Sequence, residues 1–104
     1  MGYNRGMDTT AFRHSLSQNQ PPAGASAAVE ALWWEGKGDW AAAHDRLQSD
    51  LTAEGAWVHA YLHRKEGDLS NASYWYNRAG KPVASGDLGA EWDAIAGALL
   101  DQPR

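Results

Sequence analysis

Apolar residues recur at helical spacing in five segments of this chain. Over about 27–36, residues three and four positions apart form one apolar face, and the same spacing returns over about 40–50, 53–66, 69–80 and 87–100. Residues that favour helix N-termini precede these segments, and glycine or proline follows several of them. β-Branched residues are few and do not alternate with polar ones, so no strand is predicted. The pattern therefore predicts an all-α fold.

One part of this pattern occurs twice, 29 residues apart. A helical segment, a Gly-Asp pair and a second segment with alanine five positions after the glycine are found at Gly38-Asp39 and again at Gly67-Asp68. Both aspartates are expected to cap the following helix. Because such short connections make consecutive helices antiparallel, we expect two stacked helical hairpins. The helix over 87–100 is expected to be a C-terminal capping helix on that stack.

The second copy resembles the tetratricopeptide and Sel1-like repeat families. Its small and aromatic positions match the second helix of a tetratricopeptide repeat, and its Trp-Tyr pair followed by Arg-Ala is similar to a Sel1 second helix. The likeness is strongest over residues 60–80, and the 29-residue spacing is shorter than either family's usual repeat. We therefore interpret the chain as a degenerate repeat of this kind. The resemblance implies a binding scaffold rather than an enzyme. The residues that carry it are Ala72-x-x-Trp75-Tyr76-x-Arg78-Ala79.

The beginning of the chain differs in composition from the rest. It is polar and glycine-rich, with a short helix expected after Asp8 and a proline pair that favours an extended loop. We expect residues 1–23 to be an N-terminal arm, either loop or short helix. Residues 24–104 are expected to form a single helical domain, since 104 residues is the length of one domain.

Composition narrows the classes of function. The net charge of −4 argues against nucleic-acid binding, which normally requires a basic face. The absence of cysteine excludes disulfides and thiolate metal sites. No signal-peptide pattern and no apolar run of about 20 residues is present, so we expect a cytoplasmic protein without a membrane partner. No catalytic residue and no cofactor is predicted, which weighs against an enzyme.

Six tryptophans are many for a chain of this length. Adjacent helical residues diverge by about 100°, so consecutive aromatic residues on one helix cannot all face one core. Some of the rings should line a surface that binds a protein or peptide, with a second copy of the chain as an alternative partner. Burial of these rings under the N-terminal arm is an equal alternative. The predicted partner-binding residues are Trp57, His63, Arg64, Tyr74, Trp75 and Arg78.

His59 and His63 are four residues apart and share a helical face, a spacing that can chelate a metal ion. No glutamate follows the first histidine, so the zinc-protease motif is absent. A third ligand would come from Glu66, His44 or His14. The alternative function is therefore a small-molecule or metal-binding protein, with or without catalysis, centred on His59 and His63. A purely structural role for both histidines is the commoner case, and the main prediction includes no metal.

Overall fold

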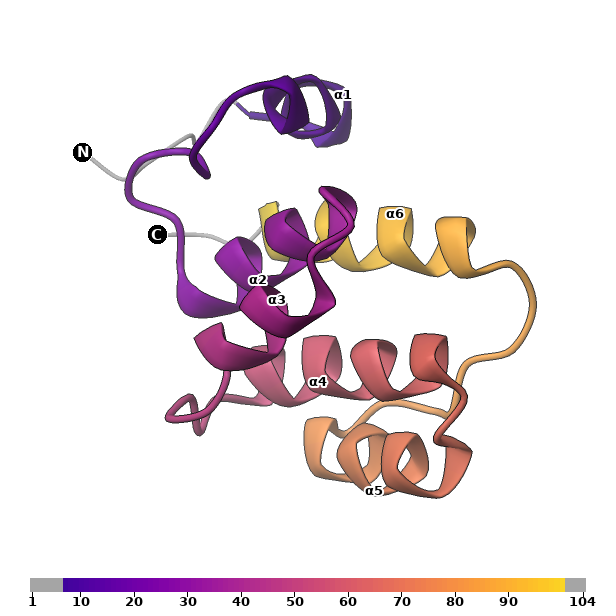
Figure 1. Cartoon of the computed structure of the whole chain (residues 1–104). Coiled ribbons are helices and arrows are strands. Elements are labelled where there is room, and N and C mark those ends of the chain that lie inside the picture. The colour runs from indigo at the N-terminus through magenta and orange to yellow at the C-terminus, as the bar shows by residue number, and fades with distance from the viewer. Residues whose placement is uncertain (1–6, 101–104) are drawn as a thin grey trace.

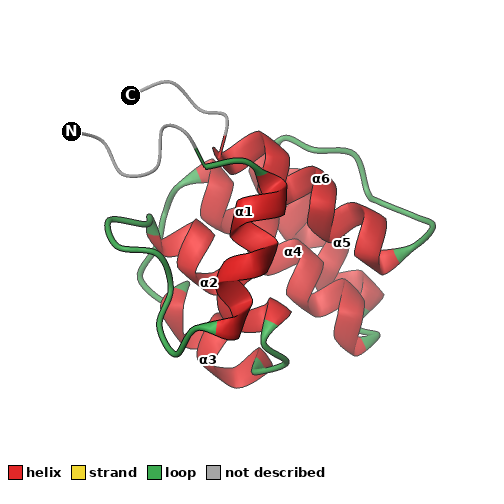
Figure 2. Cartoon of the chain, turned by 90° about the horizontal axis from the view of Figure 1, so that it is seen from above, coloured by secondary structure: helices red, strands yellow, loops and turns green. Residues whose placement is uncertain are grey.

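Six α-helices and one short 3₁₀ turn form the part of the chain that this computed structural model describes, residues 7–100 (Figure 1). Figure 2 shows helices joined by loops, with no strand in the described part of the chain. The all-α prediction is therefore confirmed. None of the described helices is long and apolar enough to cross a membrane. The elements are α1 (Thr9–His14), the turn Ser15–Ser17, α2 (Ala27–Gly36), α3 (Trp40–Arg46), α4 (Ala53–Glu66), α5 (Leu69–Ala79) and α6 (Leu88–Leu100).

Side-chain caps determine where the helices begin. Ser26 and Thr52 each accept a hydrogen bond from the backbone N–H three residues further on, and Asp87 does the same for α6. These bonds satisfy amides that have no partner within the helix. One predicted boundary differs, because the segment expected over 40–50 is helical only to Arg46. The chain leaves the helix after Arg46 and turns before Thr52, which caps α4.

The two Gly-Asp corners have the same backbone geometry. Gly38 and Gly67 adopt φ values of 89° and 91°, a left-handed conformation that costs least for a residue without a Cβ atom. The following aspartate, Asp39 or Asp68, donates its N–H to the carbonyl five residues back and accepts from the N–H three residues ahead. Each corner folds the chain back on itself. As a result α2 packs against α3, and α4 packs against α5.

Helix α6 contacts the first helix of each pair. It packs against α2 and α4, and α1 lies on its other side (Figure 1). The indole N–H of Trp92 donates to the carbonyl of Leu32 in α2 at 3.0 Å. This position differs from the capping helix expected on the stack, because the loop over 80–87 returns the chain to α2 and α4. The buried face of α6 consists of Trp92, Ile95, Ala96, Leu99 and Leu100.

The described part of the N-terminal arm contributes to the hydrophobic core. Phe12 of α1 is fully buried and stacks on Trp92 with 5.6 Å between ring centroids. Lys37, at the end of α2, donates to the backbone carbonyls of Leu16 and Gln18, which follow α1 in the chain. These bonds tie the arm to the end of α2. The short helix expected in the arm is therefore present and packed. The first six residues of the predicted arm lie outside the described residues.

Candidate functional site

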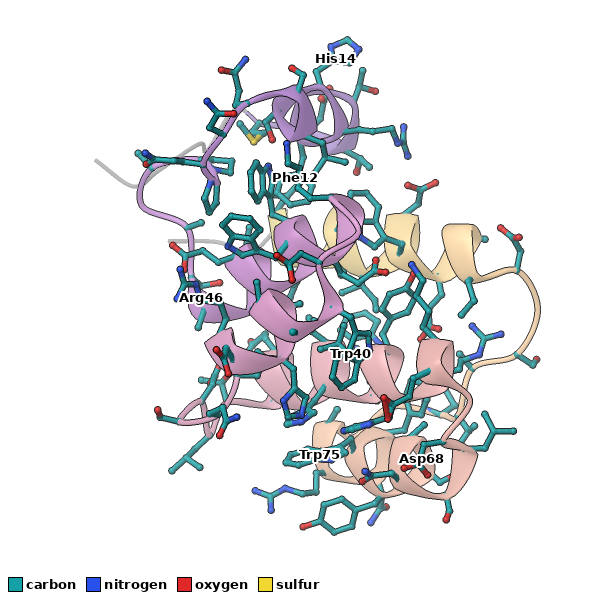
Figure 3. All side chains as sticks on the ribbon, in the orientation of Figure 1. Phe12, His14, Trp40, Arg46, Asp68 and Trp75 are labelled. Atoms are coloured by element: carbon teal, nitrogen blue, oxygen red, sulfur yellow. The ribbon has the colours of Figure 1, made fainter. Side chains whose placement is uncertain are left out.

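Three histidine side chains meet between α3 and α4. His59 and His63 lie one turn apart on α4, and His44 approaches from the last turn of α3. The Nε2 atoms of His44 and His59 are 3.0 Å apart, and one possible ligand atom from each of the three lies within 4.8 Å of the others. These residues are named the histidine cluster. Of the other candidates, His14 lies on the outer face of α1, away from α4 (Figure 3).

Two indole rings flank the histidine cluster. Trp40 stacks on His44 with 4.9 Å between ring centroids, and Trp75 of α5 stacks on His59 at 3.9 Å. The Trp40 indole N–H donates to the carbonyl of Leu62, which holds this ring between α3 and α4 (Figure 3). The His59 side chain is nearly inaccessible to solvent as a result, whereas His44 is half-buried.

A carboxylate orients the third ring. The Nδ1 atom of His63 lies 3.1 Å from Oε2 of Glu66. An ionised carboxylate can only accept a hydrogen bond, so neutral His63 carries its proton on Nδ1 and keeps a lone pair on Nε2. Metal-bound imidazoles commonly have such a partner on the nitrogen that does not bind the metal.

The surroundings of His59 disfavour its protonation. Burial, together with repulsion from the charges that His44 and His63 would carry, lowers the pKa of His59 to about 4. Its imidazole is therefore neutral near pH 7. The neutral ring is the form that can accept a hydrogen bond or bind a metal ion.

A second group of side chains lies on the outside of the α4–α5 pair. The Arg78 guanidinium lies 5.9 Å from the ring centroid of Tyr74 and 5.4 Å from that of Trp75, and it donates to the Tyr74 hydroxyl. The Lys81 ammonium lies 4.1 Å from the ring centroid of Trp57. These five residues are named the aromatic–cationic surface. Among the lysine and arginine side chains described, only Arg78 and Lys81 lack a carboxylate or carbonyl partner.

The structure separates two of the predicted partner-binding residues from the other four. His63 is buried in the histidine cluster. Arg64 donates to Glu91 at 2.7 Å, and only 12% and 8% of these two side chains are exposed. Since α4 and α5 are antiparallel, Arg64 lies at the opposite end of the pair from Arg78. The remaining four, Trp57, Tyr74, Trp75 and Arg78, belong to the aromatic–cationic surface.

Trp40 is a site residue that was not predicted from the sequence. It lies four positions before His44 on α3, and residues at this spacing are neighbours on a helix surface. That spacing was an available signal for a stacked pair. The placement of Trp75 on His59 had no comparable signal, because these residues come from different helices.

The chain matches no family model, no curated protein and no solved structure. Its function must therefore be inferred from the chemistry of these two groups of side chains.

Proposed function

We propose that the protein is a non-enzymatic interaction module that binds an acidic segment of a partner protein through the aromatic–cationic surface. The observation that carries this proposal is that Arg78 and Lys81 lie over tryptophan rings without a carboxylate. Carboxylates or carbonyls bind the other lysine and arginine side chains described, in a chain of net charge −4. A partner with carboxylates would supply the two missing ion pairs.

The composition of this surface suits protein recognition. Tyrosine, tryptophan and arginine are the residues most enriched at the energetic centres of interfaces. Arg78 is held by two rings and by the Tyr74 hydroxyl, so less side-chain entropy is lost when it binds a carboxylate. Tyr74 is 52% exposed and offers both an apolar ring and a hydroxyl group. An acidic residue bound to Arg78 would place its neighbour against this ring.

The proposal includes a repeat architecture in which α2–α3 and α4–α5 are two degenerate tetratricopeptide- or Sel1-like units. The matching geometry of the corners at Gly38 and Gly67 supports it. Because α6 covers α2 and α4, the available face of such a module is that of α5, which packs mainly against α4. No nucleic acid or membrane takes part in the proposed function, and a cytoplasmic location remains a prediction of the sequence.

Site-specific crosslinking followed by affinity measurement tests the proposal. A photoreactive amino acid in place of Ser73, an exposed neighbour of Tyr74, should crosslink one acidic partner that mass spectrometry can identify. With that partner purified, the double variant Tyr74→Ala/Arg78→Ala should bind about thirtyfold more weakly, since loss of two interface anchors costs about 2 kcal/mol. Circular dichroism should show unchanged helix content.

Arg46→Ala is the matched control, because Arg46 is an exposed arginine of α3 with 49% of its side chain accessible. Its affinity for the partner should equal that of the wild type. Equal binding by the double variant and the wild type would place the partner on another surface. If the crosslinked partner is the chain itself, light scattering should give a dimer that the double variant cannot form.

A further inference from the structure

We infer that His44, His59 and His63 form a binding site for a divalent transition-metal ion, with Zn²⁺ as the best-matched ion. This inference goes beyond the interaction function, which needs no metal. The histidine cluster brings three imidazoles from two helices together, with one nitrogen of each within 4.8 Å of the others. Its chemistry is that of metal sites formed by imidazole ligands.

The separation of the nitrogen atoms suits a tetrahedral ion. Ligand nitrogens about 2.0–2.1 Å from Zn²⁺ lie about 3.3 Å from each other at the tetrahedral angle. The Nε2 atoms of His44 and His59 are already 3.0 Å apart. In the metal-free state one of these atoms donates a hydrogen bond to the other, so the donor ring must carry its proton on Nδ1 once an ion binds. This change moves a proton within one ring and requires no rearrangement of the helices.

Each imidazole is held by a neighbour outside the cluster, which is an independent indication of a prepared site. The Glu66 carboxylate accepts from Nδ1 of His63, as carboxylates that orient metal-bound histidines do in metal centres. The other two rings are fixed by stacking. Ligands whose orientation is already set lose little entropy when an ion binds. The pairs are His44 with Trp40, His59 with Trp75, and His63 with Glu66.

The ligand chemistry selects the class of ion. Imidazole suits Zn²⁺, Co²⁺, Ni²⁺ and Cu²⁺, whereas Mg²⁺ and Ca²⁺ prefer oxygen ligands. The nearby set His63, Glu66 and Asp68 is a poorer candidate, because Asp68 already caps α5 through the Asn71 N–H. Three protein ligands leave a fourth tetrahedral position for water or a small anion.

Metal titration of the 104-residue chain tests the inference. The protein is produced without a polyhistidine tag, stripped with EDTA and titrated with ZnCl₂ by calorimetry. We expect one ion per chain with a dissociation constant in the micromolar range or below. Substitution of Co²⁺ should give the strong visible absorption of a tetrahedral site with nitrogen ligands, which ions bound loosely to surface carboxylates do not give.

Single substitutions test whether the histidine cluster, and not another side chain, binds the ion. His44→Ala should weaken Zn²⁺ binding at least a hundredfold, and its half-buried position on the short helix α3 limits any effect on folding. Glu66→Gln should weaken binding about 10–100-fold, the usual effect of losing a carboxylate that orients a metal-bound histidine. His14→Ala is the matched control, since His14 is an exposed histidine of α1, and it should bind as the wild type does.

Three results would overturn the inference. One is the absence of saturable binding of one Zn²⁺ ion by the wild type. Another is equal affinity of the wild type and a folded His44→Ala variant. The third is equal loss of binding in His14→Ala and His44→Ala. If circular dichroism shows that His44→Ala is unfolded, Glu66→Gln decides in its place because Glu66 is exposed, and unchanged affinity in that variant would also overturn the inference.

Discussion

Side chains on the two sides of α4 are held in different ways. Towards α3 and α5 its histidines contact one another and indole rings. Towards α2 and α6, Glu35 and Glu91 are largely buried and bind Lys65 and Arg64. Burial, assisted by the Glu35 carboxylate, raises the pKa of Tyr61, so its phenol remains protonated beside these carboxylates. Glu35 and Glu91 therefore both have ion-pair partners, whereas the histidines on the other side of α4 keep nitrogen lone pairs that can bind a metal ion.

At the residue scale, the metal-free protein should lose stability as the pH falls from 6.5 to 4. His59 has a pKa of 6.5 when unfolded and about 4 when folded, so the unfolded chain binds a proton in this interval that the folded chain does not. The loss is up to about 1.4 kcal/mol per pH unit and about 3 kcal/mol in total. Above pH 6.5 this residue contributes no pH dependence. The groups that face it are His44, His63 and Trp75.

Urea unfolding in EDTA at pH 7, 6, 5 and 4 measures this effect. The matched variant is His59→Gln, which removes the titrating group and should have a free energy of unfolding that depends less on pH. Equal pH dependence in the two proteins would show that His59 does not resist protonation in the folded state.

At the scale of elements, glycine has opposite effects on stability at two positions. Gly67 adopts a positive φ at a corner between helices, whereas Gly97 lies inside α6, where alanine is the better helix former. Gly67→Ala should destabilise the protein by about 1–2 kcal/mol, because alanine pays a steric cost at a φ of 91°. Gly97→Ala should stabilise it by about 0.5–1 kcal/mol. Position 97 is inside α6, and a Cβ there would meet only the Thr9 hydroxyl at an ordinary 3.6 Å.

Denaturant midpoints of the two variants and the wild type test this pair of predictions. The two substitutions add the same methyl group, so opposite shifts isolate the effect of backbone conformation. A lower midpoint for both would mean that packing outweighs conformation at position 97.

The elements themselves could be predicted from the sequence because their signals are local. Caps such as Ser26 and Thr52, glycine stops and apolar spacing predicted the bounds of α2 and α4 to the residue, whereas α3 ends four residues before its predicted end. The same spacing placed His59 and His63 on one face. It could not decide which third residue joins them, since that depends on how α3 crosses α4. The position of α6 over α2 and α4 was missed for the same reason, because the loop over 80–87 carries no signal of its direction.

At the scale of the whole molecule, the arm and α6 close what would otherwise be an open pair of hairpins. The radius of gyration over Cα atoms is 12.7 Å, the value of a compact domain of this length rather than an extended stack. Because α1 packs against α6, we expect the described part of the N-terminal arm to unfold together with the rest of the domain. Truncation of Phe12, the buried residue of α1, should therefore lower the free energy of unfolding of the whole domain.

Phe12→Ala tests this dependence. The ring is fully buried against Trp92, so its loss should destabilise the protein by about 3–5 kcal/mol. That is a large fraction of the total stability of a small domain. Thermal and urea unfolding should both show the loss as one transition. Leu51→Ala is the control, because Leu51 is 87% exposed and its substitution should change stability by less than about 0.5 kcal/mol. Separate melting of the arm in Phe12→Ala would contradict a single cooperative unit.

One ring lies at the boundary between the two proposed functions. Trp75 stacks on His59 with one face and supports Arg78 on the outside of the protein. A partner that shifts this indole would change how firmly an ion is held, and thermodynamic reciprocity then requires the ion to change the partner's affinity by the same factor. Communication between the two sites would need no long pathway, only the displacement of a single side chain.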